Sequence, residues 1–319
     1  MVETNGQALV EAVRAIPQPR HLCMEEGTQS AWLYEVLSPH VQELVVAGIA
    51  ESRGPKSDAR DAFGLAEALR IGAIATPVFK APGRFALLRE LGRTYSMLVR
   101  DVVRTQNRLK NLYRSRGVAV PGKTVYGQAR REEFLTKLPV PARTAAILLY
   151  AELDALRELK REAHKQLVAE SHRHPISHVL ETCPGLGEIR VAQLIPVVVS
   201  PERFRTSRQF WSYCGLGIVM RSSSDWVRNG DGWVRSQVAK TRGLNRRHNS
   251  TLKMIFKGAA TTIVTRHQDE PLRQDYQRLL DQGTKPNLAK LTLARKVAAT
   301  ALAMWKRQEV YDPDRYRKQ

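Results

Sequence analysis

The sequence lacks the features that would place this protein in a membrane or outside the cell. No apolar run reaches the roughly 18 residues of a membrane-spanning helix. The first residues, Met-Val-Glu-Thr-Asn-Gly-Gln, have neither the basic stretch nor the apolar core of a signal peptide. Three cysteines, Cys23, Cys183 and Cys214, are scattered and do not have the spacing of a zinc site. These absences predict a protein of the reducing cytoplasm without a membrane partner.

Acidic residues are also scarce relative to basic ones. The 319 residues include 51 Lys and Arg against 31 Asp and Glu, which gives a formal net charge of +20. A chain of this length can form two or three domains. A globular chain this basic is expected to bind a polyanion, and nucleic acid is the first candidate.

A run of serines beside an arginine is the most suggestive feature. Ser222, Ser223 and Ser224 follow Arg221, and a hairpin signal, Asn-Gly-Asp-Gly between two Trp-Val pairs, comes next. From Gly232 to Gln268 there is no acid, and the basic residues there are Arg235, Lys240, Arg242, Arg246, Arg247, Lys253, Lys257 and Arg266. Hydroxyls framed by cations suit attack on a phosphodiester, whereas a plain polar loop is the alternative interpretation.

The N-terminal part alternates helix and strand. Apolar spacing predicts helices near residues 6–16, 29–37 and 58–70, and strands at 21–25 and 43–49. This alternation favours an α/β layer with parallel strands. Three carboxylates fall at its element ends: Glu25 closes the first strand, and Asp58 and Asp61 share a face of the third helix. They could hold Mg²⁺, or the aspartates could only complement the helix dipole.

A long helical region follows. A 3-4 apolar spacing from Leu88 to Leu112 predicts a heptad seam, and a second helix is expected over about 143–171. These helices could pair as an antiparallel hairpin or pair between chains. The nearby His172, His174 and His178 have no Cys or Asp at ligand spacing, so a solvated linker is favoured over a metal site.

The last region opens with Pro-Gly-Leu-Gly before a helix. Gly185 and Gly187 could let backbone N–H groups approach a phosphate, as in a helix-hairpin-helix, or they could form an ordinary turn. The final helix is expected over about 287–308.

Several segments together resemble the DEDD-type bacterial insertion-sequence transposases, insertion-sequence family 110. They occur in the family's order and cover nearly the whole chain: M-E-E-G-T-Q-S-A-W-L, K-S-D-A-R-D-A, P-G-L-G, R-F-R-T-S-R-Q-F, Y-C-G-L, R-S-S-S-D-W and T-R-G-L-N-R-R-H-N-S-T-L-K. The last three are most similar to the subgroup with an arginine-serine-serine motif.

The resemblance implies three domains: a RuvC-like ribonuclease H fold at 1–82, a coiled-coil helical connector at 83–175 and a mostly helical transposase domain at 176–319. It implies carboxylates that bind Mg²⁺ or Mn²⁺, here Glu25 (or Glu26), Asp58 and Asp61. It also implies a serine that attacks DNA, Ser223 by position, with Ser222 and Ser224 as alternatives.

Further implications concern the partners. DNA and a structured guide RNA are expected, and a dimer or tetramer is plausible for the family. The nucleic-acid-binding residues are expected to be Gly185, Gly187, Arg221, Arg235, Lys240, Arg242, Arg246, Arg247 and Lys253.

The sequence departs from the family at its start. The family's first aspartate lies on the first strand of the sheet, and the strands before residue 21 have no counterpart here. A truncated sheet of about two strands instead of five would bind metal poorly, so weak or no strand transfer is expected. Two other functions are therefore considered: a nucleic-acid-binding remnant without chemistry, and a RuvC-like nuclease that uses metal alone.

Overall fold

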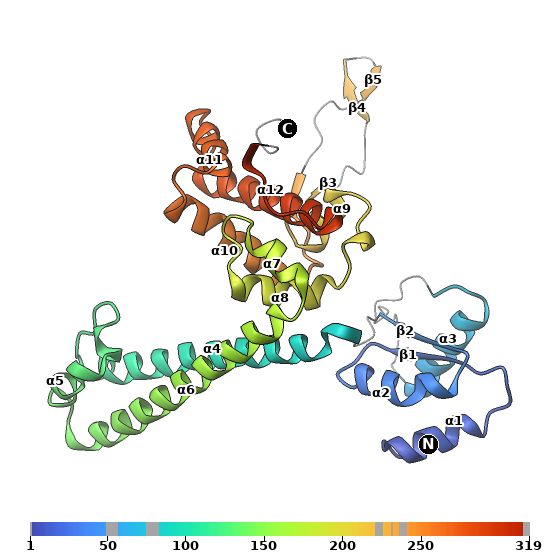
Figure 1. Cartoon of the computed structure of the whole chain (residues 1–319), viewed down its shortest axis with the longest axis horizontal. Helices are drawn as coiled ribbons and strands as arrows, with labels where there is room; N and C mark the ends of the chain where they lie inside the picture. Colours follow the sequence, from blue (N-terminus) through green and yellow to red (C-terminus); the bar gives the residue numbers. More distant parts are fainter. Residues whose placement is uncertain are drawn as a thin grey trace. The chain divides into compact units, whose positions relative to one another are not determined.

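The computed structural model describes residues 2–48, 57–74, 83–220, 226–230, 232–235 and 241–314 (Figure 1). The chain divides into two compact units, Met1–Arg84 and Phe85–Gln319. Most of the described residues are helical, and their strands form small two-stranded sheets. The predicted mixture of an α/β part with mainly helical parts is confirmed at this level. The division into three domains, the RuvC-like fold and the coiled coil stay predictions.

The first unit contains the predicted parallel strands. Strands β1 (His21–Glu25) and β2 (Glu43–Ala47) pair in parallel, with Glu25 opposite Ala47 at their carboxyl ends. Parallel neighbours need a crossover connection, and α2 (Ser30–Leu37) lies within it and packs on β2. Helix α1 (Gly6–Arg14) packs on α2, and α3 (Asp58–Arg70) packs on β1. The strands and helices expected in this region are therefore confirmed.

The two long helices of the second unit pack against each other within the chain. Helix α4 spans Ala86–Arg114 and α6 spans Val140–His172. The Thr105 hydroxyl donates to Glu152 Oε1 at 3.0 Å, and Tyr95 contacts the ring of His164 at 6.1 Å between centroids. Tyr95 precedes Thr105 on α4, whereas its partner His164 follows Glu152 on α6, so the two helices are antiparallel. Of the two predicted pairings, the hairpin within the chain is the one observed.

The far end of this helix pair has its own hydrophobic core. The segment between the helices includes α5 (Arg131–Leu135) and folds back over the ends of α4 and α6. Its core residues are Leu109, Tyr113, Val125, Phe134, Leu138 and Leu153, all at most 3% exposed. The Tyr113 and Tyr150 hydroxyls lie 3.1 Å apart, and Tyr150 also donates to the Val125 carbonyl.

A second, larger core lies among the C-terminal helices. These are α7 (Pro175–Glu181), α8 (Glu188–Val198), α9 (Ser207–Tyr213), α10 (Ser250–Arg266), α11 (Pro271–Asp281) and α12 (Pro286–Arg307). Helix α12 contacts α7, α9, α10 and α11, and Val297 and Ala298 on it are fully buried. The predicted final helix is thus confirmed and is central to this core. None of the helices in the described ranges combines the length and hydrophobicity needed to cross a bilayer.

Two short antiparallel ladders lie between α9 and α10 in sequence. Strand β3 (Ile218–Met220) pairs with β6 (Thr241–Leu244), and β4 (Trp226–Asn229) pairs with β5 (Gly232–Arg235). The β4–β5 ladder is the predicted hairpin, with Asn229 opposite Gly232 and Gly230 at a φ of 60°. Because Met220 pairs with Thr241, residues 221–240 begin and end at one end of the β3–β6 ladder.

Candidate functional site

The three predicted metal ligands lie on two elements that pack together. Glu25 is the last residue of β1, and Asp58 and Asp61 occupy the first turn of α3, which contacts β1. All three residues are exposed. No hydrogen bond or ion pair within the described ranges engages their carboxylates, whereas Glu43 and Glu67 are paired with His21 and Arg70. Their oxygens are therefore available as ligands.

The structure does not gather these carboxylates at one point. Among the described residues, one group of at least three His, Cys, Asp or Glu places its ligand atoms mutually within 4.8 Å, and Glu25, Asp58 and Asp61 are not in it. Ser57 precedes α3 in an extended conformation, but its side chain accepts no capping hydrogen bond from the helix. The acidic residues of the first turn are Asp58 and Asp61, whose charge suits the helix dipole. The predicted metal site stays a prediction.

The predicted nucleophile Ser223 lies outside the described residues, as do Ser222, Ser224, Arg221 and Lys240. The structure does describe the two strands that flank this segment. Strand β3 ends at Met220, after which Arg221 and then the serine run follow in the sequence, and β6 leads from Thr241 toward α10. The segment that holds the serines is therefore attached to the C-terminal core through one antiparallel ladder.

The segment Y-C-G-L, which precedes β3, contacts the segment N-R-R-H-N, which follows β6. Cys214 and Leu216 of Y-C-G-L are fully buried, and the Leu216 carbonyl accepts a 2.7 Å hydrogen bond from Arg295 Nε on α12. The Asn249 N–H donates to the Tyr213 carbonyl at 2.9 Å. A Cβ atom on Gly215 would lie 2.4 Å from the His248 ring. The turn after α9 and the loop before α10 therefore pack as one unit.

Asparagines fix the loop that carries the predicted arginines Arg246 and Arg247. Asn245 donates to the Ser212 carbonyl and accepts from the Arg247 N–H at 3.0 Å. Asn249 caps α10 by accepting from the Leu252 N–H at 3.1 Å. Both arginines are exposed at the start of this helix, where the helix dipole also favours an anion.

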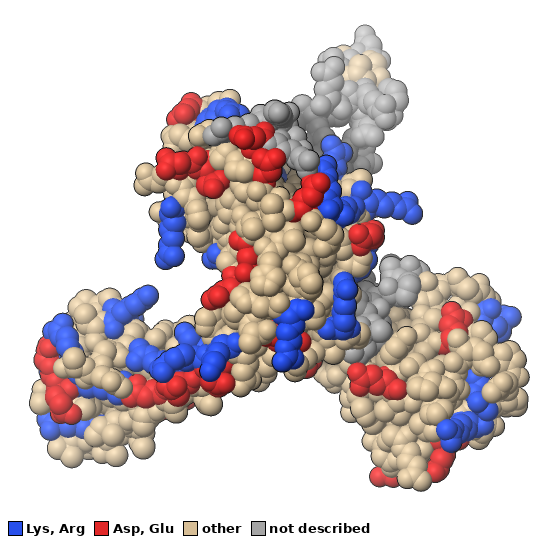
Figure 2. Space-filling model, viewed as in Figure 1, with Lys and Arg blue, Asp and Glu red and all other residues tan. Residues whose placement is uncertain are grey.

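The other predicted basic residues in the described ranges lie on α10, β5 and β6. Lys253 is half-buried on the first turns of α10. Arg235 is the last residue of β5, and Arg242 is the second residue of β6. Figure 2 shows Lys and Arg side chains over the helix pair α4–α6 as well as over the C-terminal core. Positive charge is thus spread over more of the surface than the predicted residues alone.

The two glycines of Pro-Gly-Leu-Gly have different surroundings. The segment joins α7 to α8 as a hairpin between helices. Gly185 is buried at a φ of 79°, and a Cβ atom there would lie 2.6 Å from the Ala259 carbonyl oxygen of α10. Gly187 is exposed just before α8, with no neighbour within 4 Å of its Cβ position. Gly187 is therefore the glycine open to a ligand, and Gly185 is a packing residue. Phosphate binding there stays a prediction.

Arg190 joins the same hairpin to α10. Its Nη1 donates to the Gly185 carbonyl at 2.7 Å, and its guanidinium lies 3.2 Å from the Cβ position of Gly258. Burial lowers the pKa of Arg190, with a smaller contribution from Arg266 nearby. This arginine was not predicted from the sequence. Its role follows only from the approach of α8 to α10.

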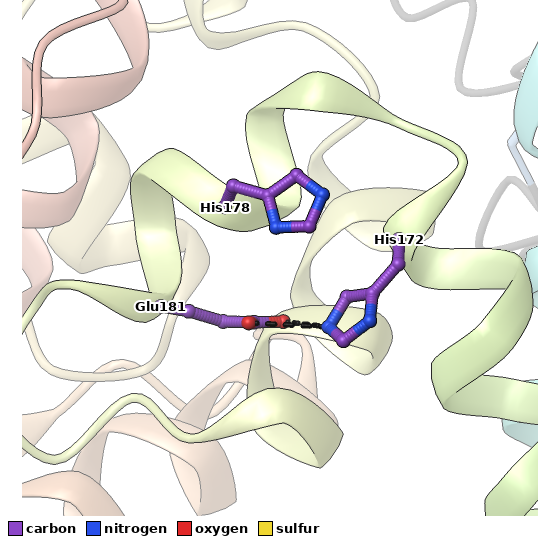
Figure 3. A group of neighbouring side chains, drawn as sticks. All are labelled: His172, His178 and Glu181. Atoms are coloured by element: carbon purple, nitrogen blue, oxygen red, sulfur yellow. Dashed lines mark hydrogen bonds and ion pairs between the residues drawn. The ribbon is translucent and has the colours of Figure 1, made fainter.

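A histidine–glutamate cluster was also missed. His172, His178 and Glu181 form the one group with clustered ligand atoms in the described parts of the chain (Figure 3). Glu181 was not among the predicted ligands, because only Cys and Asp were expected as metal-binding partners of these histidines. The signal that could have found it is the three-residue spacing of His178 and Glu181, which places both on one face of a helix.

Comparisons with known proteins match both ends of the chain to transposases. A model of IS110 DEDD type, described as Transposase, matches residues 3–115, and the model Transposase IS116/IS110/IS902 family matches residues 177–277. The "Insertion element IS116 uncharacterized 44.8 kDa protein" of Streptomyces clavuligerus is 23% identical over 98% of this chain and 88% of its own length. The "Insertion element IS110 uncharacterized 43.6 kDa protein" of Streptomyces coelicolor is 27% identical over 51% of this chain and 37% of its own length.

Proposed function

Because the chain belongs to the IS116/IS110/IS902 family of transposases, we propose that it cleaves and joins DNA strands through a covalent bond to a serine. Family membership implies a DNA substrate and strand-transfer chemistry, and the resemblance to the arginine-serine-serine subgroup is part of the proposal. The observation that carries it is that family models match both the carboxylate-bearing N-terminal part and the C-terminal part that begins at α7.

The proposed chemistry joins the two parts of the chain. The Ser223 hydroxyl attacks a phosphodiester, its oxygen bonds to phosphorus, and the displaced strand leaves with a new hydroxyl. The family generally depends on divalent metal, and Glu25, Asp58 and Asp61 supply the hard oxygen ligands that Mg²⁺ or Mn²⁺ takes. Such an ion would lower the pKa of the attacking hydroxyl and offset the charge that grows on the phosphate.

The fixed loop before α10 supports a role in holding the DNA backbone. Arg246 and Arg247 are exposed at a helix N-terminus, and Asn245 and Asn249 hold the loop that carries them. Arginines can bind phosphate with two parallel hydrogen bonds. We therefore assign these arginines to phosphate contacts near the serine segment. Guidance by a structured RNA, and assembly as a dimer or tetramer in the cytoplasm, complete the proposal by resemblance to the family.

Covalent capture gives the decisive experiment. The full chain is incubated with DNA that carries the ends of its element, the structured RNA encoded beside it, and Mg²⁺ or Mn²⁺. Adducts that survive phenol extraction are then measured. Because the short sheet predicts weak metal binding, a low yield of adducts is expected for the original chain and for Ser222→Ala and Ser224→Ala, and complete loss is expected for Ser223→Ala.

Two outcomes would favour the other functions. Strand cleavage that survives Ser223→Ala but is lost in Asp58→Asn and Asp61→Asn would indicate a nuclease that uses metal alone. Salt-sensitive DNA binding without cleavage in any variant would indicate a binding protein without chemistry.

A further inference from the structure

We propose that His172, His178 and Glu181 bind a divalent transition-metal ion, with Zn²⁺ as the preferred ion, and that this ion fastens the end of α6 to α7. The site uses none of the proposed Mg²⁺ ligands, which lie on β1 and α3 in the other compact unit. It does not depend on the proposed strand-transfer chemistry.

The ligand atoms already lie close together. His172 Nε2 is 3.0 Å from Glu181 Oε1 and 3.2 Å from Oε2. The rings of His172 and His178 stack at 5.0 Å between centroids (Figure 3), and all three ligand atoms lie within 4.8 Å of one another. Ligands of one zinc ion at about 2.0–2.2 Å are separated by roughly 3.3–3.5 Å. The two exposed rings would have to turn out of their stacked arrangement for their nitrogens to converge on one ion.

The backbone beneath the three side chains is fixed before any ion binds. Ser171 and Ser177 are fully buried, with their hydroxyl oxygens 2.6 Å apart. The Ser177 hydroxyl also contacts the Ser171 carbonyl at 2.7 Å. These contacts tie the last turn of α6 to α7, so His172 is held opposite the helix face that carries His178 and Glu181. A preformed backbone lowers the entropy lost when the ligands are ordered.

The donor set is that of a transition metal. Two imidazole nitrogens and a carboxylate suit Zn²⁺, and they leave a further position for water. Mg²⁺ prefers oxygen ligands and is a poor match for imidazole. An ordinary His172–Glu181 hydrogen bond explains two of the residues but not the third. Among the described residues, no hydrogen bond or ion pair engages the His178 ring, so its nitrogens are available to a metal.

The position of the site suggests what a bound ion does. Helix α6 belongs to the long helix pair, whereas α7 packs on α8 and α12 of the C-terminal core. An ion shared by His172 and α7 therefore strengthens the joint between these two parts of the second unit. Both histidines are exposed, so the ion can enter from solvent without local unfolding.

The test is Zn²⁺ titration by calorimetry. The full chain, without a polyhistidine tag and stripped with a chelator, is titrated in excess Mg²⁺, which occupies oxygen-ligand sites. One Zn²⁺ per chain is expected. His178→Ala and His172→Ala are each expected to weaken Zn²⁺ binding by at least about tenfold, since even outer-shell changes cost 10–100-fold. The His178 side chain is exposed and has no hydrogen bond to any residue in the described ranges, so its substitution leaves the fold intact.

A matched control separates this site from any exposed histidine–glutamate pair. His164 Nε2 lies 3.1 Å from Glu188 Oε1, but the described part of the chain places no third ligand beside this pair. His164→Ala is expected to leave Zn²⁺ affinity unchanged. Zn²⁺ should raise the unfolding temperature of the original chain and of His164→Ala, but not that of His178→Ala. Equal Zn²⁺ affinity and equal stabilisation in the original chain and His178→Ala would overturn the proposal.

Discussion

A Cβ atom on Gly185 would lie 2.6 Å from the carbonyl oxygen of Ala259, 74 residues further along the chain. Real Cβ atoms do not approach backbone this closely, and Gly185 also has a φ of 79°, which disfavours other residues. Helices α8 and α10 can therefore pack here only with glycine at this position. The hairpin between α7 and α8 is thus held by contact with α10.

Gly185→Ala is expected to destabilise the protein strongly. The positive φ costs about 1–2 kcal/mol and overpacking about 1–3 kcal/mol, so a loss of roughly 2–5 kcal/mol is expected in urea unfolding. Gly187→Ala is the matched control. Its free energy of unfolding should fall by at most about 1 kcal/mol, because no atom lies within 4 Å of the Cβ position of Gly187. If Gly187→Ala instead weakens DNA binding at unchanged stability, a phosphate contact at the hairpin is supported. Equal stability of the two variants would contradict the packing role of Gly185.

Gly215 and His248 should be energetically coupled. A Cβ atom on Gly215 meets the His248 ring at 2.4 Å, so Gly215→Ala forces the ring out of its place. In a His248→Ala variant, Gly215→Ala should lower the free energy of unfolding by less than it does in the original chain. A double-mutant cycle of unfolding free energies is expected to give a coupling of about 0.5–3 kcal/mol. Additive effects would show that the turn after α9 and the loop before α10 do not support each other.

The Arg131–Asp154 ion pair should make the stability of the α4–α6 end pH-dependent. Both guanidinium Nη atoms contact the carboxylate at 2.5 Å, and the hydrogen bond to Arg131 lowers the pKa of Asp154. A lowered folded-state pKa stabilises the fold above the unfolded-state pKa of about 3.9, and this contribution is lost as the pH falls through the folded-state value.

Asp154→Asn should therefore lower the free energy of unfolding by about 1–2 kcal/mol at neutral pH. The loss is modest because the carboxylate is only partly buried. Its difference from the original chain should shrink below about pH 4. Glu158→Gln, which breaks an exposed pair with Arg161, is the control and should change stability little. A loss at pH 7 as small as that of the control would refute the prediction.

The three cysteines should differ in reactivity. Cys183 and Cys214 are at most 1% exposed, and burial raises the pKa of Cys183 to about 12 and also raises that of Cys214. Cys23 is half-buried, and burial raises its pKa as well. Because the thiolate is the reactive form, alkylation of the folded protein should label Cys23 first and the others only after denaturation. Peptide mass analysis would show this order, and early labelling of Cys214 would contradict the packing beneath β3.

Local patterns in the sequence determined the elements and the family. The apolar spacing predicted α4 and α6, the Asn-Gly-Asp-Gly signal predicted the β4–β5 hairpin, and alternation predicted parallel β1 and β2, because each property depends on residues a few positions apart. The ordered segments identified the transposase family before any fold was known, and the family models confirmed it. The roles of Glu25, Asp58, Asp61 and Ser223 stay predictions that rest on sequence.

Tertiary structure alone decided which distant residues meet. Helices α4 and α6 pack against each other within the chain, and Glu181 lies beside His172. Gly185 packs against Ala259, and Gly215 packs against His248. No periodicity encodes such pairs, because each depends on how whole helices pack and not on the spacing within one of them. The Gly185, Gly215 and Glu181 contacts depend on the buried core around α12, whereas the α4–α6 pairing also depends on the separate core at the far end of that helix pair.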